Sequence, residues 1–147
     1  MPSTLIGQAA RMTLEELETL VGEFGPFVRL FGFRAEEIGH GTAKVRLPYN
    51  VDHTRPGGTI SGPAIMALAD YAMYVAVLGA IGNEPLAVTT SLNINFLRKP
   101  AEADLICDAK LLKLGRRLVI GDMAVHAEGD DEMCAHVTAT YSIPPQG

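Results

Sequence analysis

The longest apolar stretch of the chain runs from Gly57 to Gly82 and is hydrophobic on almost every side. From about Gly62 onward it predicts one helix of roughly 20 residues, about 30 Å long. Pro63 suits the first helical position, and Ser61 or Gly62 can cap the start. A helix that is apolar all round is normally buried. Asp70 is its single charged residue, and a carboxylate in such surroundings is costly unless it is paired, hydrogen-bonded or neutralised.

Alternating apolar and polar positions predict strands on both sides of this helix. The runs cover residues 27–38, with a bend at Gly32, and then 42–47, 86–97, 103–114, 118–127 and 133–143. Short turns join the last three runs, which predicts an antiparallel meander. One sheet with one long apolar helix to cover predicts an α+β fold, a curved antiparallel sheet wrapped around a central helix.

The N-terminal residues form a separate unit in this interpretation. Residues 1–12 are an arm, and Thr13 with Glu16 forms a capping box at the start of a short amphipathic helix that Gly25-Pro26 ends. We therefore divide the chain into an arm and helix, residues 1–26, and a main domain, residues 27–147. A sheet edge left open would pair with another strand, so we expect edge-to-edge or face-to-face pairing into at least a homodimer. We further expect a homotetramer, a dimer of dimers.

Composition narrows the function classes. The 147 residues carry a net charge of −5, which argues against a nucleic-acid surface, because that needs a basic face. Cys107 and Cys134 have no metal-ligand spacing and are expected to be small buried residues. The N-terminus lacks the apolar run of a signal peptide. The long helix has the length of a membrane span, but Asp70 near its middle and the strands after it favour a helix in the core of a soluble protein. We expect a cytoplasmic protein with no metal and no cofactor.

Two interpretations of Asp70 remain open from the residues alone. It could be a structural acid that is capped or salt-bridged, pairing with an arginine such as Arg55 or Arg98. It could instead be a general base or nucleophile whose pKa is tuned by its surroundings.

The stretch from Gly58 to Asp70, GTISGPAIMALAD, resembles the signature of PaaI-type hotdog acyl-CoA thioesterases, in which a His-Gly-Gly sequence precedes an acidic helix residue. The run from Val88 to Arg98 resembles the third strand of that family. The turn Gly115-Arg116-Arg117 and the ending Ala139-Thr140-Tyr141 also match. The likeness covers about residues 27–143 and implies the hotdog fold.

The resemblance implies three roles. Asp70 would act as general base toward water or as nucleophile on the thioester. The backbone N–H of Gly62, at the helix N-terminus, would polarise the thioester carbonyl, where unpaired amides and positive potential suit an oxyanion. Thr89 on the neighbouring subunit, with Thr90 as second choice, would help to place the water or the acid.

The sequence departs from the family pattern at three positions. Ser61 stands where the signature has His, Pro63 replaces the second Gly and has no N–H to donate, and Arg55 stands where an Asn is frequent. The oxyanion donors are thus reduced to Gly62 and Ala64. Ser61 could supply a weaker hydrogen bond than the histidine, and His53 in the preceding loop is a candidate to replace it.

Basic residues are candidates for the phosphates of coenzyme A, because guanidinium groups bind phosphate oxygens in pairs; the alternative is a solvated charge on a turn. These are Arg98, Lys99, Arg116 and Arg117.

Three functions follow from these observations. The first is hydrolysis of a small or medium acyl- or aryl-CoA thioester. The second is an acyl-CoA or fatty-acid binding protein with little or no turnover, which the changes at Ser61, Pro63 and Arg55 motivate. The third is a hotdog dehydratase, which ranks last because the long helix offers Asp70 and no histidine.

Overall fold

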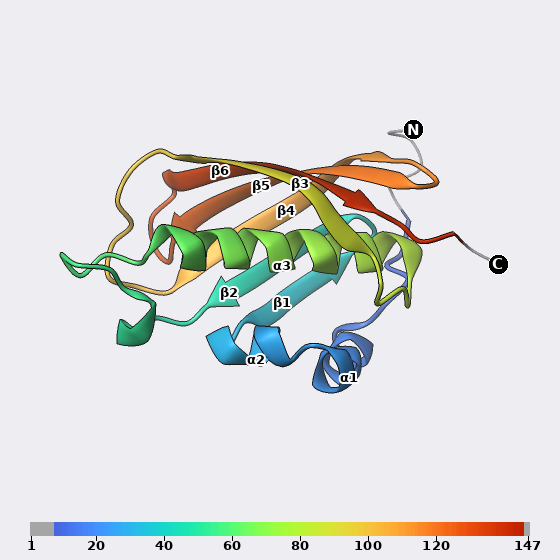
Figure 1. Cartoon of the computed structure of the whole chain (residues 1–147), viewed down its shortest axis with the longest axis horizontal. Helices are drawn as coiled ribbons and strands as arrows, with labels where there is room; N and C mark the ends of the chain where they lie inside the picture. The colour runs from blue at the N-terminus through green and yellow to red at the C-terminus, as the bar shows by residue number, and fades with distance from the viewer. Residues whose placement is uncertain (1–7, 146–147) are drawn as a thin grey trace.

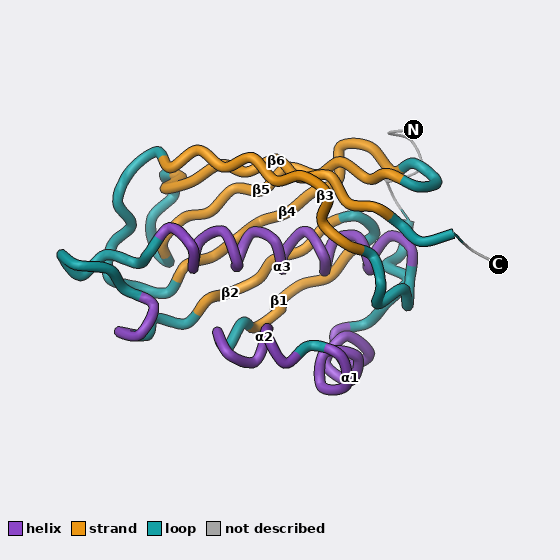
Figure 2. The backbone as a smooth tube through the Cα atoms, viewed as in Figure 1, coloured by secondary structure: helices purple, strands orange, loops and turns teal. Residues whose placement is uncertain are grey.

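The computed structural model describes residues 8–145, except for the side chain of Phe24. Within that range, six antiparallel strands form one sheet in the order β1-β2-β4-β5-β6-β3, which curves around the helix α3 (Figures 1 and 2). The predicted α+β arrangement is confirmed. The strands are β1 (Arg34–Gly39), β2 (Thr42–Leu47), β3 (Val88–Phe96), β4 (Leu105–Leu114), β5 (Leu118–Ala127) and β6 (Met133–Ser142).

The central helix α3 spans Gly62–Ile81, as the sequence predicts. Ser61 is its N-cap, and the side-chain oxygen of Ser61 accepts a hydrogen bond from the Ala64 N–H. By length and composition α3 could cross a membrane, but 72% of its apolar window is buried inside the fold. It is therefore the core helix that the sheet covers.

Two glycines let the helix and the sheet approach closely. A Cβ added at Gly79 of α3 would overlap the backbone carbonyl of Gly39 in β1. A Cβ added at Gly121 of β5 would overlap the flexible sulfur end of Met73. The first clash is with backbone and the second is with a side chain that can move, so the two positions differ in tolerance although both lie in the core.

The N-terminal segment packs on the same core. Helix α1 (Leu14–Phe24) begins with the predicted capping box of Thr13 and Glu16, and it buries Leu17 almost completely. Before it, the Arg11 N–H donates to the Gly79 carbonyl at 2.8 Å, and Met12 is 3% exposed. The end of the expected arm is thus attached to α3, whereas residues 1–7 lie outside the described part of the chain.

Residues 26–31 form a helix, α2 (Pro26–Phe31), where the sequence predicts the first half of a strand. Pro26 occupies the start of this helix, and Gly32 ends it with a φ of 72°. Proline at the start and a left-handed glycine at the end are typical of a helix, so Gly32 is a helix cap and not a strand bend. Helices α1 and α2 lie along the β1 edge of the sheet (Figure 1).

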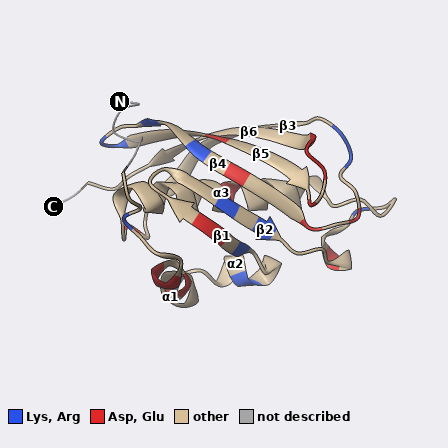
Figure 3. Cartoon of the chain, turned by 180° about the vertical axis from the view of Figure 1, so that it is seen from behind, with Lys and Arg blue, Asp and Glu red and all other residues tan. Residues whose placement is uncertain are grey.

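The face of the sheet turned away from α3 carries charged side chains on β1, β2 and β4 (Figure 3). They form ion pairs between strands: Lys44 of β2 contacts Glu37 of β1 at 3.5 Å, and Arg46 of β2 contacts Asp104, directly before β4, at 2.9 Å. The strands therefore present an apolar face to the helix and a charged face outward, which is the pattern expected of a sheet with one buried side.

Candidate active site

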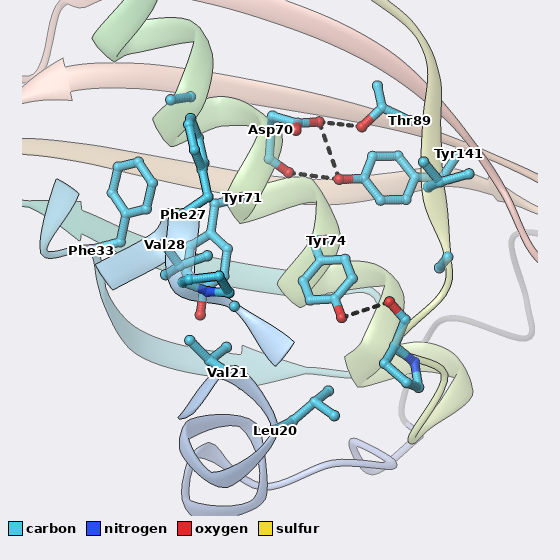
Figure 4. Close-up of a pocket in the computed structure, with 16 residues that line it drawn as sticks. Leu20, Val21, Phe27, Val28, Phe33, Asp70, Tyr71, Tyr74, Thr89 and Tyr141 are labelled. Carbon is cyan, nitrogen blue, oxygen red and sulfur yellow. Dashed lines mark hydrogen bonds between the residues drawn. The ribbon is translucent and has the colours of Figure 1, made fainter. Parts of the chain in front are cut away.

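Asp70 lies near the middle of α3 and is held by two hydroxyl groups (Figure 4). Its Oδ1 accepts a hydrogen bond from Thr89 Oγ1 at 2.5 Å and lies 3.1 Å from the Tyr141 hydroxyl. The same Tyr141 hydroxyl lies 2.9 Å from the backbone carbonyl oxygen of Asp70. Neither Arg55 nor Arg98 pairs with Asp70 in the described part of the chain, so the interpretation as an arginine-paired structural acid is wrong.

A β-bulge brings Thr89 to Asp70. The register between β3 and β6 shifts between Thr89 and Ser91, and Thr89 lies opposite Tyr141. Residues opposite each other on antiparallel strands share a face, so both hydroxyls point toward α3. Simple alternation would place Thr89 and Leu92 on opposite faces of the sheet, so the bulge is what turns Thr89 inward, where it meets Asp70 within one chain.

A cavity of about 550 Å³ opens beside Asp70, between α3, the start of β3 and the N-terminal helices. Its walls are mainly aromatic and aliphatic (Figure 4). The rings of Phe33 and Tyr71 are stacked with centroids 5.4 Å apart, and the Tyr71 and Tyr74 centroids are 6.3 Å apart. Among the described residues that line this cavity, Asp70 is the only charged one and none is a histidine.

The tyrosines of the cavity stay neutral. Burial raises the pKa of Tyr71, Tyr74 and Tyr141 above the usual value for a phenol, and the Asp70 carboxylate raises that of Tyr141 further. A neutral phenol keeps its hydrogen-bond donor. Tyr74 uses this donor on the Pro85 carbonyl at 3.1 Å, which leaves Tyr141 as the phenol directed at the carboxylate.

The N-terminus of α3 offers one free backbone amide. Pro63 has no N–H, and the Ala64 N–H is taken by the Ser61 side chain at 3.3 Å. The Gly62 N–H forms no hydrogen bond within the described chain, so Gly62 remains as a donor and Ala64 does not. Gly62 borders a second cavity, of about 320 Å³, together with Arg55, Phe96, Arg98 and Lys99.

The Gly62 N–H and the Asp70 carboxylate lie far apart within one chain. Gly62 precedes Asp70 by eight residues in a continuous helix, which corresponds to about 12 Å along the axis. A thioester carbonyl within reach of the Asp70 carboxylate is therefore out of reach of the Gly62 N–H of the same chain.

The other predicted binding residues divide into two groups, and the first, Ser61, His53 and Arg98, lies near the start of α3. The His53 carbonyl accepts a hydrogen bond from the Ser61 N–H at 2.8 Å, and the centroid of the His53 ring lies 5.2 Å from that of Phe31. Arg98 is engaged by Asp130 and Glu132, the latter at 2.8 Å. This pairing neutralises much of its charge within the chain.

Thr90, Arg116 and Arg117 are not brought together with Asp70 in one chain. Thr90 is exposed and donates to the Thr140 carbonyl at 3.2 Å, on the side of the bulge away from the cavity. Arg116 and Arg117 lie exposed on the turn between β4 and β5, and Arg116 borders a separate cavity with Arg11 and His40.

Tyr141 is the residue at the site to which sequence reasoning assigns no role. The alternation of the last strand predicts it as one of the inward positions, and it is indeed buried. The available signal was chemical: a buried tyrosine usually needs a hydrogen-bond partner, and Asp70 is the one acid on the helix that this strand faces. Within the described residues no cluster of histidine, cysteine and acidic side chains could hold a metal ion.

Comparison with known proteins gives a consistent result. Residues 57–134 match the thioesterase superfamily. A crystal structure described as a "putative thioesterase" from Silicibacter sp. TM1040 is 41% identical, with 95% of this chain and 97% of that chain covered and a TM-score of 0.84. The phenylacetic acid degradation protein PaaI from Thermus thermophilus, solved as a point mutant, is 28% identical, with 81% and 99% covered and a TM-score of 0.71.

A curated relative from Saccharolobus solfataricus, described as a "putative esterase", is 28% identical over 76% of this chain and 73% of its own length. These likenesses confirm the hotdog fold and the resemblance to PaaI-type proteins that the sequence indicated.

Proposed function

Because the chain belongs to the thioesterase superfamily of hydrolases, we propose that it hydrolyses a small or medium acyl- or aryl-coenzyme A thioester, with Asp70 as the reacting acid. The observation that carries this proposal is the placement of Asp70. It is the one charged residue among the described residues that line an apolar, aromatic cavity, and two hydroxyl groups hold its Oδ1.

In this reaction the acyl group occupies the aromatic cavity and the thioester carbonyl lies beside Asp70. Acting as a general base, the free Oδ2 takes a proton from a water molecule whose oxygen bonds to the carbonyl carbon. The carbon–sulfur bond then breaks, and the proton passes from Asp70 to the departing thiolate. Acting as a nucleophile, Asp70 would bond to the carbonyl carbon itself, and water would cleave the resulting anhydride. Both routes give a free acid and coenzyme A.

A complete site needs two copies of the chain. The carbonyl oxygen becomes negative as the carbon is attacked, and backbone amides at a helix N-terminus stabilise such an oxyanion. Since Gly62 lies about 12 Å along the helix from Asp70, we assign the amide to a second protomer. The edge strand β3 carries Thr89 and Phe96 and has a free side, which makes it the candidate strand for pairing in a homodimer. The tetramer and the cytoplasmic location remain predictions.

Coenzyme A would lie along the start of the helix. Arg55 and Lys99 border the cavity at Gly62 and have no ion pair among the described residues, so they suit the phosphate groups. Ser61, His53 and Arg98 lie in the same region. Thr90, Arg116 and Arg117 are candidates only where a second subunit brings them near the site.

Binding of an acyl-CoA with little turnover is the second candidate. It is favoured by the loss of oxyanion donors at the start of α3, where Pro63 has none and the Ser61 side chain takes that of Ala64. Removal of one such donor typically lowers the rate by about 10²–10³-fold. No histidine borders the Asp70 cavity among the described residues, which leaves the dehydratase interpretation without its second group.

A panel of acyl-CoA substrates separates these functions. Short, medium and aryl acyl-CoAs are incubated with the purified protein, coenzyme A release is followed with a thiol reagent, and binding is measured by calorimetry. Release in multiple turnovers supports the hydrolase. Binding without release over hours supports the second candidate, and neither binding nor release would contradict both.

A further inference from the structure

Tyr141 takes no part in the reaction as described, yet its hydroxyl lies at the centre of the hydrogen bonds around Asp70. The side chain comes from β6 and is 2% exposed. Its hydroxyl lies 2.9 Å from the Asp70 backbone oxygen and 3.1 Å from Asp70 Oδ1 (Figure 4). A phenol has one proton to donate, so these two acceptors compete for it.

The competition depends on the charge of Asp70. A hydrogen bond to an ionised acceptor is roughly twice as strong as one between neutral groups, so the proton points to Oδ1 while the carboxylate is charged. When Asp70 holds the proton taken from water, the backbone carbonyl is the better acceptor, and the phenol can turn to it without losing a partner. The Tyr141 hydroxyl is thus matched to both protonation states that a general base passes through.

We infer that Tyr141 is a positioning residue, which fixes the Asp70 carboxylate through Oδ1 and keeps Oδ2 directed to the substrate. This inference rests on the proposed function. Thr89 donates to the same Oδ1 at 2.5 Å, so both donors hold one oxygen. Oδ2 has no hydrogen bond in the described part of the chain and remains free for the proton of the attacking water.

Among the described residues that line the cavity in one chain, no other charged side chain competes with this assignment. The titratable groups that face Asp70 are the phenols of Tyr71 and Tyr74 on α3 and of Tyr141 on β6, and Thr89 on β3 is uncharged. Burial raises the pKa of all three phenols, so they stay neutral over the range in which a carboxylate titrates. Glu18 of α1 raises the pKa of Tyr71, Glu84 raises the pKa of Tyr74, and neither glutamate lines the cavity.

Tyr141→Phe tests the inference, because it removes the hydroxyl and keeps the ring. We expect kcat to fall about tenfold with KM changed less than about twofold, since a lost hydrogen bond to a charged group costs about that factor or more. Tyr49→Phe is the matched control: it removes the hydroxyl group of an exposed loop residue outside the site, and both kcat and KM should stay at wild-type values.

A second measurement does not depend on turnover. The carboxyl-carbon chemical shift of Asp70 at a fixed neutral pH, followed by NMR with labelled aspartate, should change in Tyr141→Phe and stay unchanged in Tyr49→Phe, because only the first variant removes a hydrogen bond to Oδ1. A folded Tyr141→Phe protein with an unchanged chemical shift would overturn the positioning role. If the wild type hydrolyses no acyl-CoA but the chemical shift still changes, the proposed function fails while the hydrogen-bond assignment stands.

A double-mutant cycle with Thr89→Val completes the test. Both hydroxyls act on Oδ1, so their effects on kcat should be non-additive, with a coupling of at least about threefold. Independent effects that simply multiply would show that Tyr141 does not act through the carboxylate.

Discussion

Replacement of Gly62 by proline is the sharpest test of the oxyanion donor. Proline removes the N–H and keeps a backbone that the site already tolerates. Ser61, which would precede it, has φ −70° and ψ 151°, and this extended conformation is the one that proline favours in its predecessor. A proline in the first turn of a helix costs no internal hydrogen bond. The variant should therefore fold and lose the donor, and the effect of the added ring atoms is measured separately with the control below.

The expected loss follows from the hydrogen bonds at the start of α3. Ala64 donates to Ser61 and Pro63 has no N–H, so no second amide replaces that of Gly62. Loss of one oxyanion donor costs about 10²–10³-fold in kcat, or about 2.7–4 kcal/mol. We expect Gly62→Pro to reach the upper part of that range.

Gly62→Ala is the matched control for bulk. It keeps the N–H but adds a Cβ 3.2 Å from Phe96 Cζ. Because the Phe96 side chain is 53% exposed and can turn away, kcat should fall less than about tenfold, the ordinary cost of a small packing change.

Steady-state kinetics of coenzyme A release, with circular dichroism and a melting curve for each variant, provide the assay. If both variants fold and lose the same activity, bulk and not the missing N–H is responsible. If Gly62→Pro keeps the rate of Gly62→Ala, the amide is not the oxyanion donor.

Three further predictions concern assembly, packing and pH. Random mixing of subunits carrying Asp70→Asn with subunits carrying Gly62→Pro should restore about a quarter of wild-type activity. Half of the dimers are then mixed, and each mixed dimer has one intact site out of two. No recovery of activity would mean that both groups act within one chain. Gly79→Ala should destabilise the fold by about 3 kcal/mol in urea unfolding, while Gly121→Ala should cost less than about 1.5 kcal/mol, and equal effects would contradict the difference between a backbone and a side-chain clash. The Tyr49 N–H and then Arg46 lower the pKa of Asp104. This stabilisation is present above the carboxyl's unfolded pKa of about 3.9 and is lost as pH falls through the lowered value. Asp104→Asn lacks the ionisable group, so its free energy of unfolding should fall less steeply on acidification than that of the wild type.

The large elements could be predicted because their patterns are long. The apolar run after Gly62 is twenty residues of helix, and the strands β4, β5 and β6 alternate between turns. The shorter segment from Pro26 to Phe31 reads as strand from its composition because it is apolar and aromatic. Its helical conformation depends on Pro26 and Gly32 at its ends, which are local signals that outweigh composition over six residues.

The sequence predicts Asp70 as the candidate acid and Thr89 as its helper, but it does not predict how the fold holds the two together. Asp70 stands out because a charge inside an apolar helix is costly. The bulge at Thr89 breaks the alternation of β3 and has no signature in the sequence, so the contact between Thr89 and Asp70 within one chain could not be predicted. The ion pairs of Arg98 with Asp130 and Glu132 join residues more than thirty positions apart, and only the folded sheet brings them together.

The most direct test of the account is the rate of coenzyme A release by the wild type and by Asp70→Asn, measured on the best acyl-CoA of the panel. Asparagine keeps the size of the side chain but cannot accept the proton of the attacking water or bond to the acyl carbon. We predict a loss of at least about 10³-fold, in line with other essential acid–base and nucleophilic groups, with acyl-CoA binding retained. Equal rates for the two proteins would show that Asp70 is not the reacting group.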